Sequence, residues 1–332
     1  MRDDRLIEPE NARRRAAYRT DARLLEILAL MNETLAPVEH YAPSGVPRPN
    51  LFVFGLPRSG TTLLYQLIAY CLDLGYISNL AARFWLAPLT GVVLSRAVLG
   101  DRRDGSFRSD YGKSLDPAGP HEFSYFWHKR LGIARVEDML CFGRSGDAID
   151  WQALSDMIGC LQDFFASGLV HKTNFVANFA PGFVRHLAMP LLIHIERDPQ
   201  EVALSILKAR QVYYGDVTTW WATYPPTYPA IRDQNFATQI VRQVADLRRT
   251  YAGVMAAIDP DLVVRVSYQE LCRDPGGVLE IIRDRVAHRH GVTIGWLNQP
   301  PRRFAPSPSA PERTQEEAAV IDAWHRLAAA MQ

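Results

Sequence analysis

The stretch from Asn50 to Ala69 contains the residue types that hold an anion at the start of a helix. It reads NLFVFGLPRSGTTLLYQLIA, an apolar run followed by a turn rich in glycine, serine and threonine. Gly55 and Gly60 occupy the glycine positions of a G-x-x-x-x-G-K-[ST] phosphate loop, but Thr61 stands where that pattern has lysine. Arg58 is the cation inside the loop. The sequence therefore predicts an anion site that differs from an ATP site.

A buried strand and a helix must flank this loop if it is to hold an anion. Leu51 to Phe54 are consecutive apolar residues, as in a strand covered on both faces. Apolar residues then recur at helical spacing, which predicts a helix over residues 60–72. The first turn of such a helix points N–H groups and the positive end of its dipole at the loop, where Thr61 and Thr62 add hydroxyl groups. The alternative is an ordinary turn between a strand and a helix.

A second strand, turn and helix follow from Pro190 onwards. Leu191 to Ile195 form the expected strand, and Asp198 and Glu201 fit a capping box at the start of the next helix. Arg197 comes at the carboxyl end of the strand, where open α/β sheets bind ligands, and Ser205 lies two turns into the helix. The alternatives are a salt bridge at the strand end for Arg197 and a packed hydroxyl for Ser205.

The string from Pro57 to Thr62, PRSGTT, resembles the loop that binds the 5′-phosphosulfate in sulfotransferases that use 3′-phosphoadenosine 5′-phosphosulfate (PAPS). In that family the loop reads P-[KR]-S-G-T-[TS], with its cation where Arg58 stands. The donor has neither β- and γ-phosphates nor a bridging magnesium ion, so the resemblance accounts for the missing lysine and implies no metal. It also implies which residues surround the 5′-phosphate of the donor: Arg58, Ser59, Gly60, Thr61 and Thr62.

The second segment is similar to the 3′-phosphate motif of the same family. That motif has an apolar strand, then Arg-[DN]-Pro, then a serine eight residues after the arginine. The resemblance implies that Arg197 and Ser205 hold the 3′-phosphate of PAPS.

The segment GLVHKTN, residues 168–174, looks like a short strand that ends in Lys172 and Thr173. Cytosolic members of the family carry Lys-Thr-His on the corresponding strand, which implies that Lys172 stabilises the transferring sulfuryl group. The third residue here is Asn174, and an amide cannot take a proton at neutral pH. The base of the reaction must therefore come from elsewhere. The alternative for Lys172 is a solvated strand end.

His121 and Glu122, at the start of an aromatic segment, are the candidates for this base. Carbohydrate and protein sulfotransferases often use a glutamate, and the Glu-x-x-x-Phe/Trp setting here is similar to theirs. A carboxylate in an apolar cleft has a raised pKa, which suits a general base, whereas a histidine needs no such adjustment. The alternative is that Glu122 merely starts a helix whose aromatic residues are core.

An aromatic-rich connection over residues 213–228 could form a lid or a wall of the acceptor site, or could cap the core. Glycine and proline interrupt it, which argues against a regular element. Its aromatic residues are Tyr213, Tyr214, Trp220, Trp221, Tyr224 and Tyr228.

The composition restricts the broad class of the protein. The chain has 332 residues, 48% of them hydrophobic and 22% charged, which permits a large core. A net charge of +1 gives no reason to expect nucleic acid or an anionic membrane as a partner. The four cysteines show no spacing of a disulfide framework or a zinc site. The N-terminus has no apolar leader and no run approaches the ~18 residues of a membrane span, so we expect a cytoplasmic enzyme.

The predicted fold is α/β, a P-loop-like three-layer arrangement with a central, mostly parallel sheet flanked by helices. Residues 1–49 form a helical extension, with one helix over 10–36. Residues 50–332 form a single domain with insertions at about 75–165 and 213–235 on the acceptor side. Further helices are expected over 151–167 and 235–258, and a strand over 262–266 followed by a capping box at Ser267. The loop from Pro300 to Pro311 contains Arg302 and Arg303, whose role is not assigned.

These observations predict a sulfotransferase that moves a sulfuryl group from PAPS to a hydroxyl of a small-molecule, carbohydrate or lipid acceptor. Attack is in line, a general base takes the proton, and 3′-phosphoadenosine 5′-phosphate (PAP) is the product. The alternatives are a non-catalytic nucleotide-binding protein on the same fold, and a P-loop kinase. The oligomeric state is left open.

Overall fold

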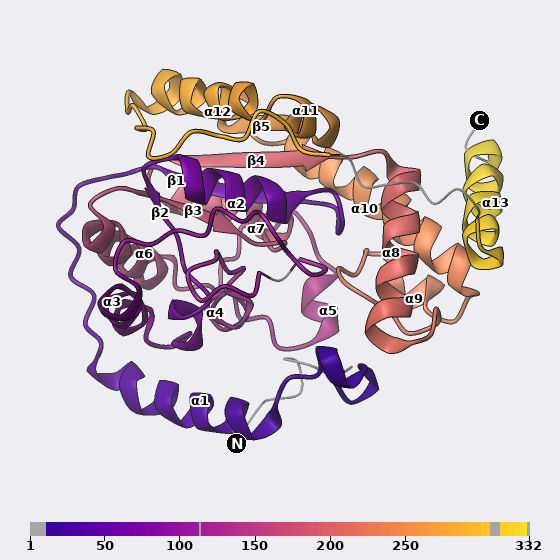
Figure 1. Ribbon diagram of the computed structural model, residues 1–332, viewed down its shortest axis with the longest axis horizontal. Coiled ribbons are helices and arrows are strands. Elements are labelled where there is room, and N and C mark those ends of the chain that lie inside the picture. Colours follow the sequence, from indigo (N-terminus) through magenta and orange to yellow (C-terminus); the bar gives the residue numbers. More distant parts are fainter. Residues whose placement is uncertain (1–10, 113, 306–312, 331–332) are drawn as a thin grey trace.

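The computed structural model describes residues 11–112, 114–305 and 313–330. Its centre is a parallel sheet with the strand order β2-β3-β1-β4-β5 (Figure 1). The α/β class is confirmed, and every pairing within this sheet is parallel. The strands are β1 Asn50–Gly55, β2 Leu74–Gly75, β3 Gly168–Lys172, β4 Pro190–Glu196 and β5 Val263–Ser267.

Helices cover both faces of the sheet. The side chains of β1 from Leu51 to Phe54 are apolar and alternate between the two faces, so both faces are buried. Leu51 and Val53 point into the core cluster shared with α2, α11 and α12, whereas Phe52 and Phe54 point into the cluster shared with α4, α6, α7, α8 and α10. This confirms three layers. The helices are α1 Ala22–Leu35, α2 Thr61–Cys71, α3 Pro88–Leu99, α4 Ser124–Arg130, α5 Val136–Met139, α6 Trp151–Phe165, α7 Val176–His186, α8 Pro199–Tyr214, α9 Tyr228–Ile231, α10 Phe236–Ala256, α11 Tyr268–Arg273, α12 Pro275–His290 and α13 Gln315–Ala330.

The register of the strands brings their carboxyl ends to one edge of the sheet. Val53 of β1 lies opposite Lys172 at the end of β3, and Gly55 lies opposite Ile195 of β4. Glu196, the last residue of β4, lies opposite Ser267 at the end of β5. β3 pairs with β1 on one side and β4 on the other, so the strand order reverses direction at β1. Open α/β sheets bind ligands at such a switch point.

The N-terminal region differs from the expected single helix over 10–36, of which residue 10 lies outside the described part. Short 3-10 turns at Asn11–Arg13 and Ala16–Tyr18 precede α1. Side chains interrupt the helix here: Asn11 Oδ1 accepts from the N–H of Thr20 at 2.9 Å, and Asp21 caps α1. The continuous-helix prediction was wrong because these local bonds to the backbone compete with helical ones.

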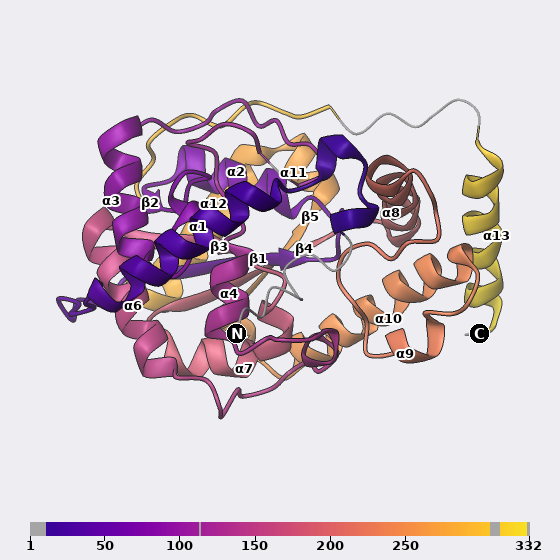
Figure 2. The ribbon, with the colours of Figure 1, turned by 90° about the horizontal axis from the view of Figure 1, so that it is seen from below.

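The remaining elements lie around this three-layer centre. In Figures 1 and 2, α13 lies beside α8 and α10, and α1 runs outside the layer that contains α3 and α4. Residues 306–311 of the expected Pro300–Pro311 loop lie outside the described residues, while Arg302 and Arg303 are exposed. No helix of the described ranges has both the length and the hydropathy to cross a bilayer.

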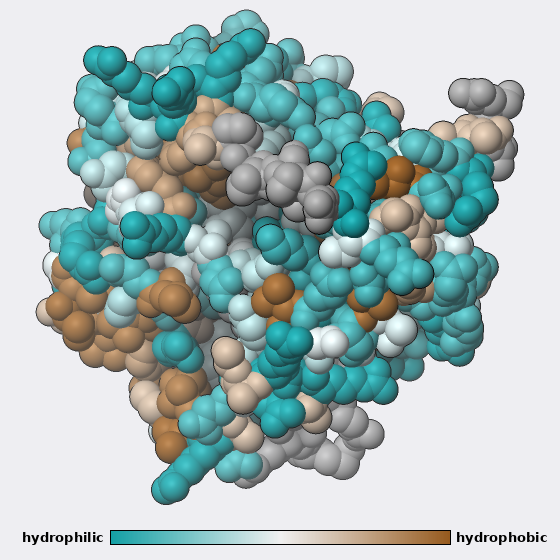
Figure 3. Space-filling model, turned by 45° about the vertical axis from the view of Figure 1, so that its right-hand side comes forward, coloured by the Kyte–Doolittle hydropathy of each residue, from teal (hydrophilic) through white to brown (hydrophobic). Residues whose placement is uncertain are grey.

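The described surface is mixed in polarity. In Figure 3, hydrophobic side chains gather on the left flank of the view, while hydrophilic side chains cover most of the rest. Large apolar side chains are exposed on α1 and α3: Leu24, Ile27, Leu30, Met31, Val93, Leu94 and Val98.

His171 of β3 makes the stability of the fold depend on pH. Its ring is buried, stacks on Phe52 with 4.9 Å between the ring centroids, and Nε2 lies 3.4 Å from Oδ1 of Asn50. Burial lowers the pKa of His171 from 6.5 to about 3. The unfolded chain therefore takes up this proton at a higher pH than the folded chain does. The contribution to the free energy of unfolding is present above the ordinary histidine pKa and is lost as the pH falls towards 3.

We expect this contribution at about pH 5 to be roughly 2 kcal/mol smaller than at about pH 7.5. The variant His171→Gln does not titrate, so its difference in unfolding free energy between these two pH values should be smaller than that of the wild-type chain by about that amount. Urea unfolding at both pH values measures it. An equal difference in the two proteins would show that His171 does not cause the pH dependence.

Candidate functional site

The loop between β1 and α2 has left-handed backbone angles at two residues. Arg58 has a φ of 69° and Gly60 a φ of 102°, both in the left-handed region. A Cβ at Gly60 would lie 2.5 Å from Cδ2 of Tyr268, the first residue of α11. Glycine at position 60 is therefore required both by the backbone angle and by the close approach of this ring.

The start of α2 has backbone N–H groups that no side chain of the described residues caps. No side chain caps this helix at Gly60, whereas Asp198 caps α8 and Asn235 caps α10. The hydroxyl of Ser59 is buried and has no hydrogen-bond partner among the described residues. An uncapped helix start beside an unsatisfied buried hydroxyl suits an anion such as phosphate or sulfate.

Arg58 lies against the helix that carries Ser205. Its Nε donates to Oγ of Ser205 at 3.0 Å, and its guanidinium carbon lies 5.0 Å from the ring centroid of Tyr111. Burial lowers the pKa of Arg58, and the charge of the neighbouring Arg197 lowers it further. The group stays protonated because an arginine in a protein does not lose its proton at neutral pH.

Arg197 reaches the same loop from the end of β4. Its Nη1 donates to the carbonyl oxygen of Arg58 at 3.2 Å, and its guanidinium carbon lies 4.5 Å from the ring centroid of Tyr268. Its Nε donates to Oε2 of Glu201 at 2.9 Å. The expected capping role of Glu201 is therefore corrected: Asp198 caps α8, and the Glu201 carboxylate instead holds Arg197.

Lys172 lies at the point where β3, the start of α2 and the loop before α4 meet. Its Nζ donates to Oγ1 of Thr62 at 2.7 Å and forms an ion pair with Oε1 of Glu122. The Lys172 side chain is 4% exposed and that of Glu122 is 35% exposed. Glu122 therefore does not stand alone in an apolar cleft, as the sequence suggested, but reaches from a buried cation towards solvent.

His121 is directed differently from Glu122. Its Nδ1 accepts a hydrogen bond from the backbone N–H of Phe123 at 2.8 Å. The lone pair of Nδ1 is therefore engaged by the backbone just before α4. Of the two candidates for the base, Glu122 is the one that forms an ion pair with Lys172 within the described residues.

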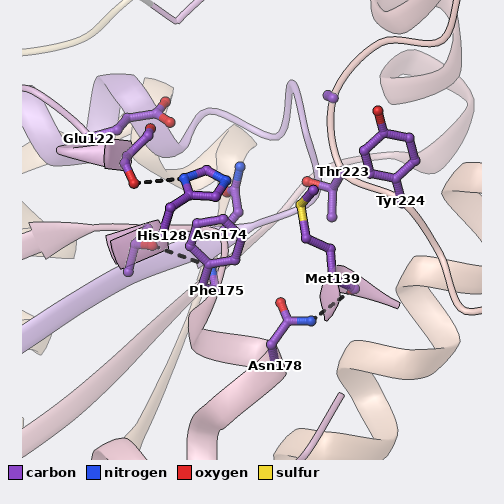
Figure 4. Close-up of a pocket in the computed structure, with 11 residues that line it drawn as sticks. Glu122, His128, Met139, Asn174, Phe175, Asn178, Thr223 and Tyr224 are labelled. Atoms are coloured by element: carbon purple, nitrogen blue, oxygen red, sulfur yellow. Dashed lines mark hydrogen bonds between the residues drawn. The ribbon is translucent and has the colours of Figure 1, made fainter. Parts of the chain in front are cut away.

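A cavity of about 190 Å³ begins at Glu122 (Figure 4). Three parts of the chain line it: the segment from Glu122 to Met139, the segment after β3, and residues 222–224 of the aromatic-rich connection. Asn174, which stands where the cytosolic pattern has histidine, lies on its wall. The lining side chains are Glu122, Ser124, His128, Met139, Thr173, Asn174, Phe175, Asn178, Ala222, Thr223 and Tyr224.

His128 of α4 is a lining residue that the sequence did not indicate. Its Nδ1 lies 2.8 Å from the carbonyl oxygen of Ser124, so Nδ1 carries a proton and donates to that oxygen. Its ring contacts Phe175 edge to face, with 4.8 Å between centroids. Burial lowers the pKa of His128. It is therefore neutral near pH 7 and has a lone pair on Nε2.

The aromatic-rich connection divides between the wall of the cavity and the core. Thr223 and Tyr224 line the cavity, whereas Trp220 is buried and stacks on Tyr224 with 5.7 Å between centroids. Tyr213 instead lies near the loop, edge to face with Tyr111 at 5.9 Å.

The structure thus brings Arg58, Arg197 and Ser205 together on one side of the loop and Lys172, Thr62 and Glu122 on the other. Sequence reasoning missed Tyr111, Tyr268 and His128. The signal for Tyr268 was its place two residues after the strand predicted over 262–266; Tyr111 and His128 carried no comparable signal.

Other chemistry is limited within the described residues. They contain no group of three or more His, Cys, Asp or Glu side chains placed to hold a metal ion. The four cysteines are free thiols, with Cys141 exposed and the others buried.

Solved structures similar to this chain include bacterial sulfotransferases. STF1 from Mycobacterium tuberculosis H37Rv is 13% identical over 80% of this chain and 74% of its own, with a TM-score of 0.47. STF9 from Mycobacterium avium is 17% identical over 79% and 68%, with a TM-score of 0.42. The sulfotransferase domain from the curacin biosynthetic pathway is 16% identical over 73% and 75%, with a TM-score of 0.40. No protein-family model and no curated sequence matches the chain.

Two glycine substitutions test the geometry of the loop. We expect Gly60→Ala to lower the free energy of unfolding by about 1–3 kcal/mol, because a Cβ there is strained by its backbone angle and by Tyr268. Gly253→Ala is the matched control: it lies inside α10 with no atom within 4 Å of an added Cβ, so it should be neutral or stabilising. Urea unfolding measures both variants, and equal effects would contradict the required geometry.

Proposed function

We propose that this protein is a sulfotransferase that transfers a sulfuryl group from PAPS to a hydroxyl group. The observation that carries the proposal is the meeting of Lys172, Thr62 and Glu122 between the loop after β1 and a cavity. A donor held by the loop and an acceptor in the cavity would meet at Lys172. In-line transfer requires this order of groups.

The donor side is supported by groups that an anion would satisfy. The buried hydroxyl of Ser59 and the uncapped start of α2 are available to the 5′-phosphate. Arg58 and Arg197 are two adjacent cations, and Glu201 pairs with Arg197. A phosphate between these cations would lower their mutual repulsion, so the 3′-phosphate would bind at Arg197 and Ser205.

The transfer step follows from the groups at Lys172. The acceptor oxygen would attack the sulfur and form the new S–O bond, while the bond from sulfur to the 5′-phosphate oxygen breaks and that oxygen leaves on PAP. Lys172, Arg58 and the N–H groups of the loop would stabilise the charge on the sulfuryl and phosphate oxygens. Holding the two substrates in line would supply much of the remaining acceleration.

Glu122 would take the proton of the acceptor hydroxyl. It contacts Lys172 on one side and lines the cavity on the other, so its carboxylate can reach the attacking oxygen. Lys172 would shift from Glu122 towards the sulfuryl oxygens when the donor binds, which frees the carboxylate. His121 is the second candidate, with its Nδ1 already bonded to the backbone of Phe123.

The donor site is tested by binding of PAP. We expect Arg58→Ala and Arg197→Ala each to raise the Kd for PAP by about 10- to 100-fold, because each removes charge-assisted hydrogen bonds. Arg232→Ala, which removes an exposed cation paired with Asp233, is the control and should leave the Kd unchanged. Calorimetry measures the three variants. Unchanged affinity in both site variants, or tighter binding of Mg-ATP than of PAP, would refute the donor assignment.

The transfer step is tested by two nearly isosteric variants. We expect Lys172→Met to lower kcat by about 10²–10³-fold and Glu122→Gln by about 10²–10⁴-fold, while both still bind PAP. Transfer of radiolabelled sulfate from PAPS to a panel of hydroxyl acceptors measures the rates. Full activity of Glu122→Gln would assign the base to another residue.

A further inference from the structure

The N-terminal segment packs beside the candidate donor site. Residues 11–20, which we call the N-terminal strap, form a closed turn: Asn11 Oδ1 accepts from the N–H of Thr20 at 2.9 Å. Within it, Nε of Arg19 donates to the carbonyl oxygen of Arg14 at 2.6 Å. In Figure 2 the strap lies beside α8 before the chain continues into α1.

Three contacts attach the strap to the end of α8. The backbone N–H of Arg15 donates to the carbonyl oxygen of Tyr213 at 2.7 Å. The guanidinium carbon of Arg14 lies 5.9 Å from the centroid of the Tyr213 ring. The ring of Tyr18 stacks on that of Tyr213, with 4.4 Å between centroids and 28° between the ring planes. Tyr213 is buried, so the strap covers a ring that belongs to the body of the protein.

Tyr213 links the strap to the loop after β1. Its ring lies edge to face with that of Tyr111, with 5.9 Å between centroids, and the centroid of the Tyr111 ring lies 5.0 Å from the guanidinium carbon of Arg58. On its other side, Arg58 donates from Nε to Oγ of Ser205. The direction of the Arg58 side chain therefore depends on two contacts, of which one is the ring of Tyr111.

The residue after Tyr111 reaches the other group of site residues. A Cβ at Gly112 would lie 3.6 Å from Oγ1 of Thr62 and 4.0 Å from Oε1 of Glu122. Both residues have left-handed backbone angles, with φ of 45° at Tyr111 and 95° at Gly112. Such an angle is unfavourable for tyrosine, so surrounding contacts must hold this segment in place.

Tyr18 supplies such contacts from the strap. Desolvation raises the pKa of Tyr18, and a hydrogen bond to Asp110 and the charge of that carboxylate raise it further. Asp110 directly precedes Tyr111. Tyr18 therefore acts on residues 110–112 in two ways, directly at Asp110 and through the ring of Tyr213.

We propose that the strap holds residues 110–112 on the loop after β1, and that the stacked ring of Tyr18 is what holds the strap. Arg58 then stays directed towards Ser205, and a phosphate group binds there with a smaller loss of side-chain entropy. The identity of that ligand as a nucleotide rests on the sulfotransferase function proposed above. Tyr18 acts through Tyr111 and Arg58, so it is a positioning residue of the donor site.

Binding of PAP to the full chain measures the effect on the ligand. We expect Tyr18→Ala to raise the Kd for PAP by about 3- to 10-fold through faster release, because Arg58 loses one of its two orienting contacts. Tyr18→Phe keeps the ring on Tyr213 and should stay within about two-fold of the wild-type Kd. Trp296→Ala removes a partly buried ring beside Arg283 and is the matched control, with an unchanged Kd.

Three results would overturn the proposal. They are an unchanged Kd in Tyr18→Ala, an equal increase in Trp296→Ala, and a Tyr18→Phe variant that binds as weakly as Tyr18→Ala.

A double-mutant cycle tests the route through Tyr111. We expect Tyr111→Ala alone to raise the Kd for PAP at least as much as Tyr18→Ala does. Adding Tyr18→Ala to Tyr111→Ala should then change the Kd by less than about two-fold, because the contact that Tyr18 supports is already gone. Additive increases would show that Tyr18 does not act through Tyr111, against the proposal.

Hydrogen exchange measures the strap without any ligand. In the full chain without nucleotide, we expect Tyr18→Ala to speed backbone exchange of residues 106–112 by about ten-fold, and Trp296→Ala to leave it unchanged. In the wild-type chain, bound PAP should slow exchange of residues 11–20, because coupling between two sites is reciprocal.

These outcomes separate the strap from the donor. If PAP does not bind but Tyr18→Ala speeds exchange of residues 106–112, the sulfotransferase proposal fails while the role of the strap stands. If PAP binds and Tyr18→Ala changes neither exchange nor affinity, the role of the strap is wrong and the donor proposal stands.

Discussion

The parallel register around β1 is the constraint on which the rest of the site depends. Because β3, β1, β4 and β5 end at one edge of the sheet, residues more than a hundred positions apart in the chain lie close together there. Lys172 is the last residue of β3, and Arg197 directly follows the last residue of β4. A slip of one residue in either pairing would direct these side chains to the opposite face.

Charge is distributed unevenly along the line from the loop to the cavity. The loop side gathers the guanidinium groups of Arg58 and Arg197 and the start of a helix, and the Glu201 carboxylate lies on Arg197. The cavity side is neutral apart from Glu122, and Lys172 lies between the two. This gradient favours an anionic molecule on the loop side. It also suits a reaction in which negative charge develops on the loop side and a proton leaves on the cavity side.

Local patterns predicted the elements that carry the site, because their signals lie within a few residues. The apolar run of β1, the cap at Asp198 and the strand ending at Lys172 are of this kind. What sequence could not supply were contacts between distant segments: the Tyr111 ring on Arg58, the Glu201 carboxylate on Arg197, and the position of His128 on the cavity wall. The helix expected over 10–36 failed for a related reason, since side-chain bonds to the backbone at Asn11 and Asp21 outweigh weak helical periodicity.

Tyr268 joins the two halves of the proposed anion site. Its ring lies on the guanidinium of Arg197 and against Gly60, and Arg197 in turn donates to the carbonyl of Arg58. A ligand group that shifts Arg197 must therefore also shift the ring that packs on the loop. If the donor binds as proposed, the free energies with which its two phosphates bind are coupled rather than additive. Under that proposal, the affinity for a nucleotide with both phosphates would differ from the value expected from its two halves measured separately.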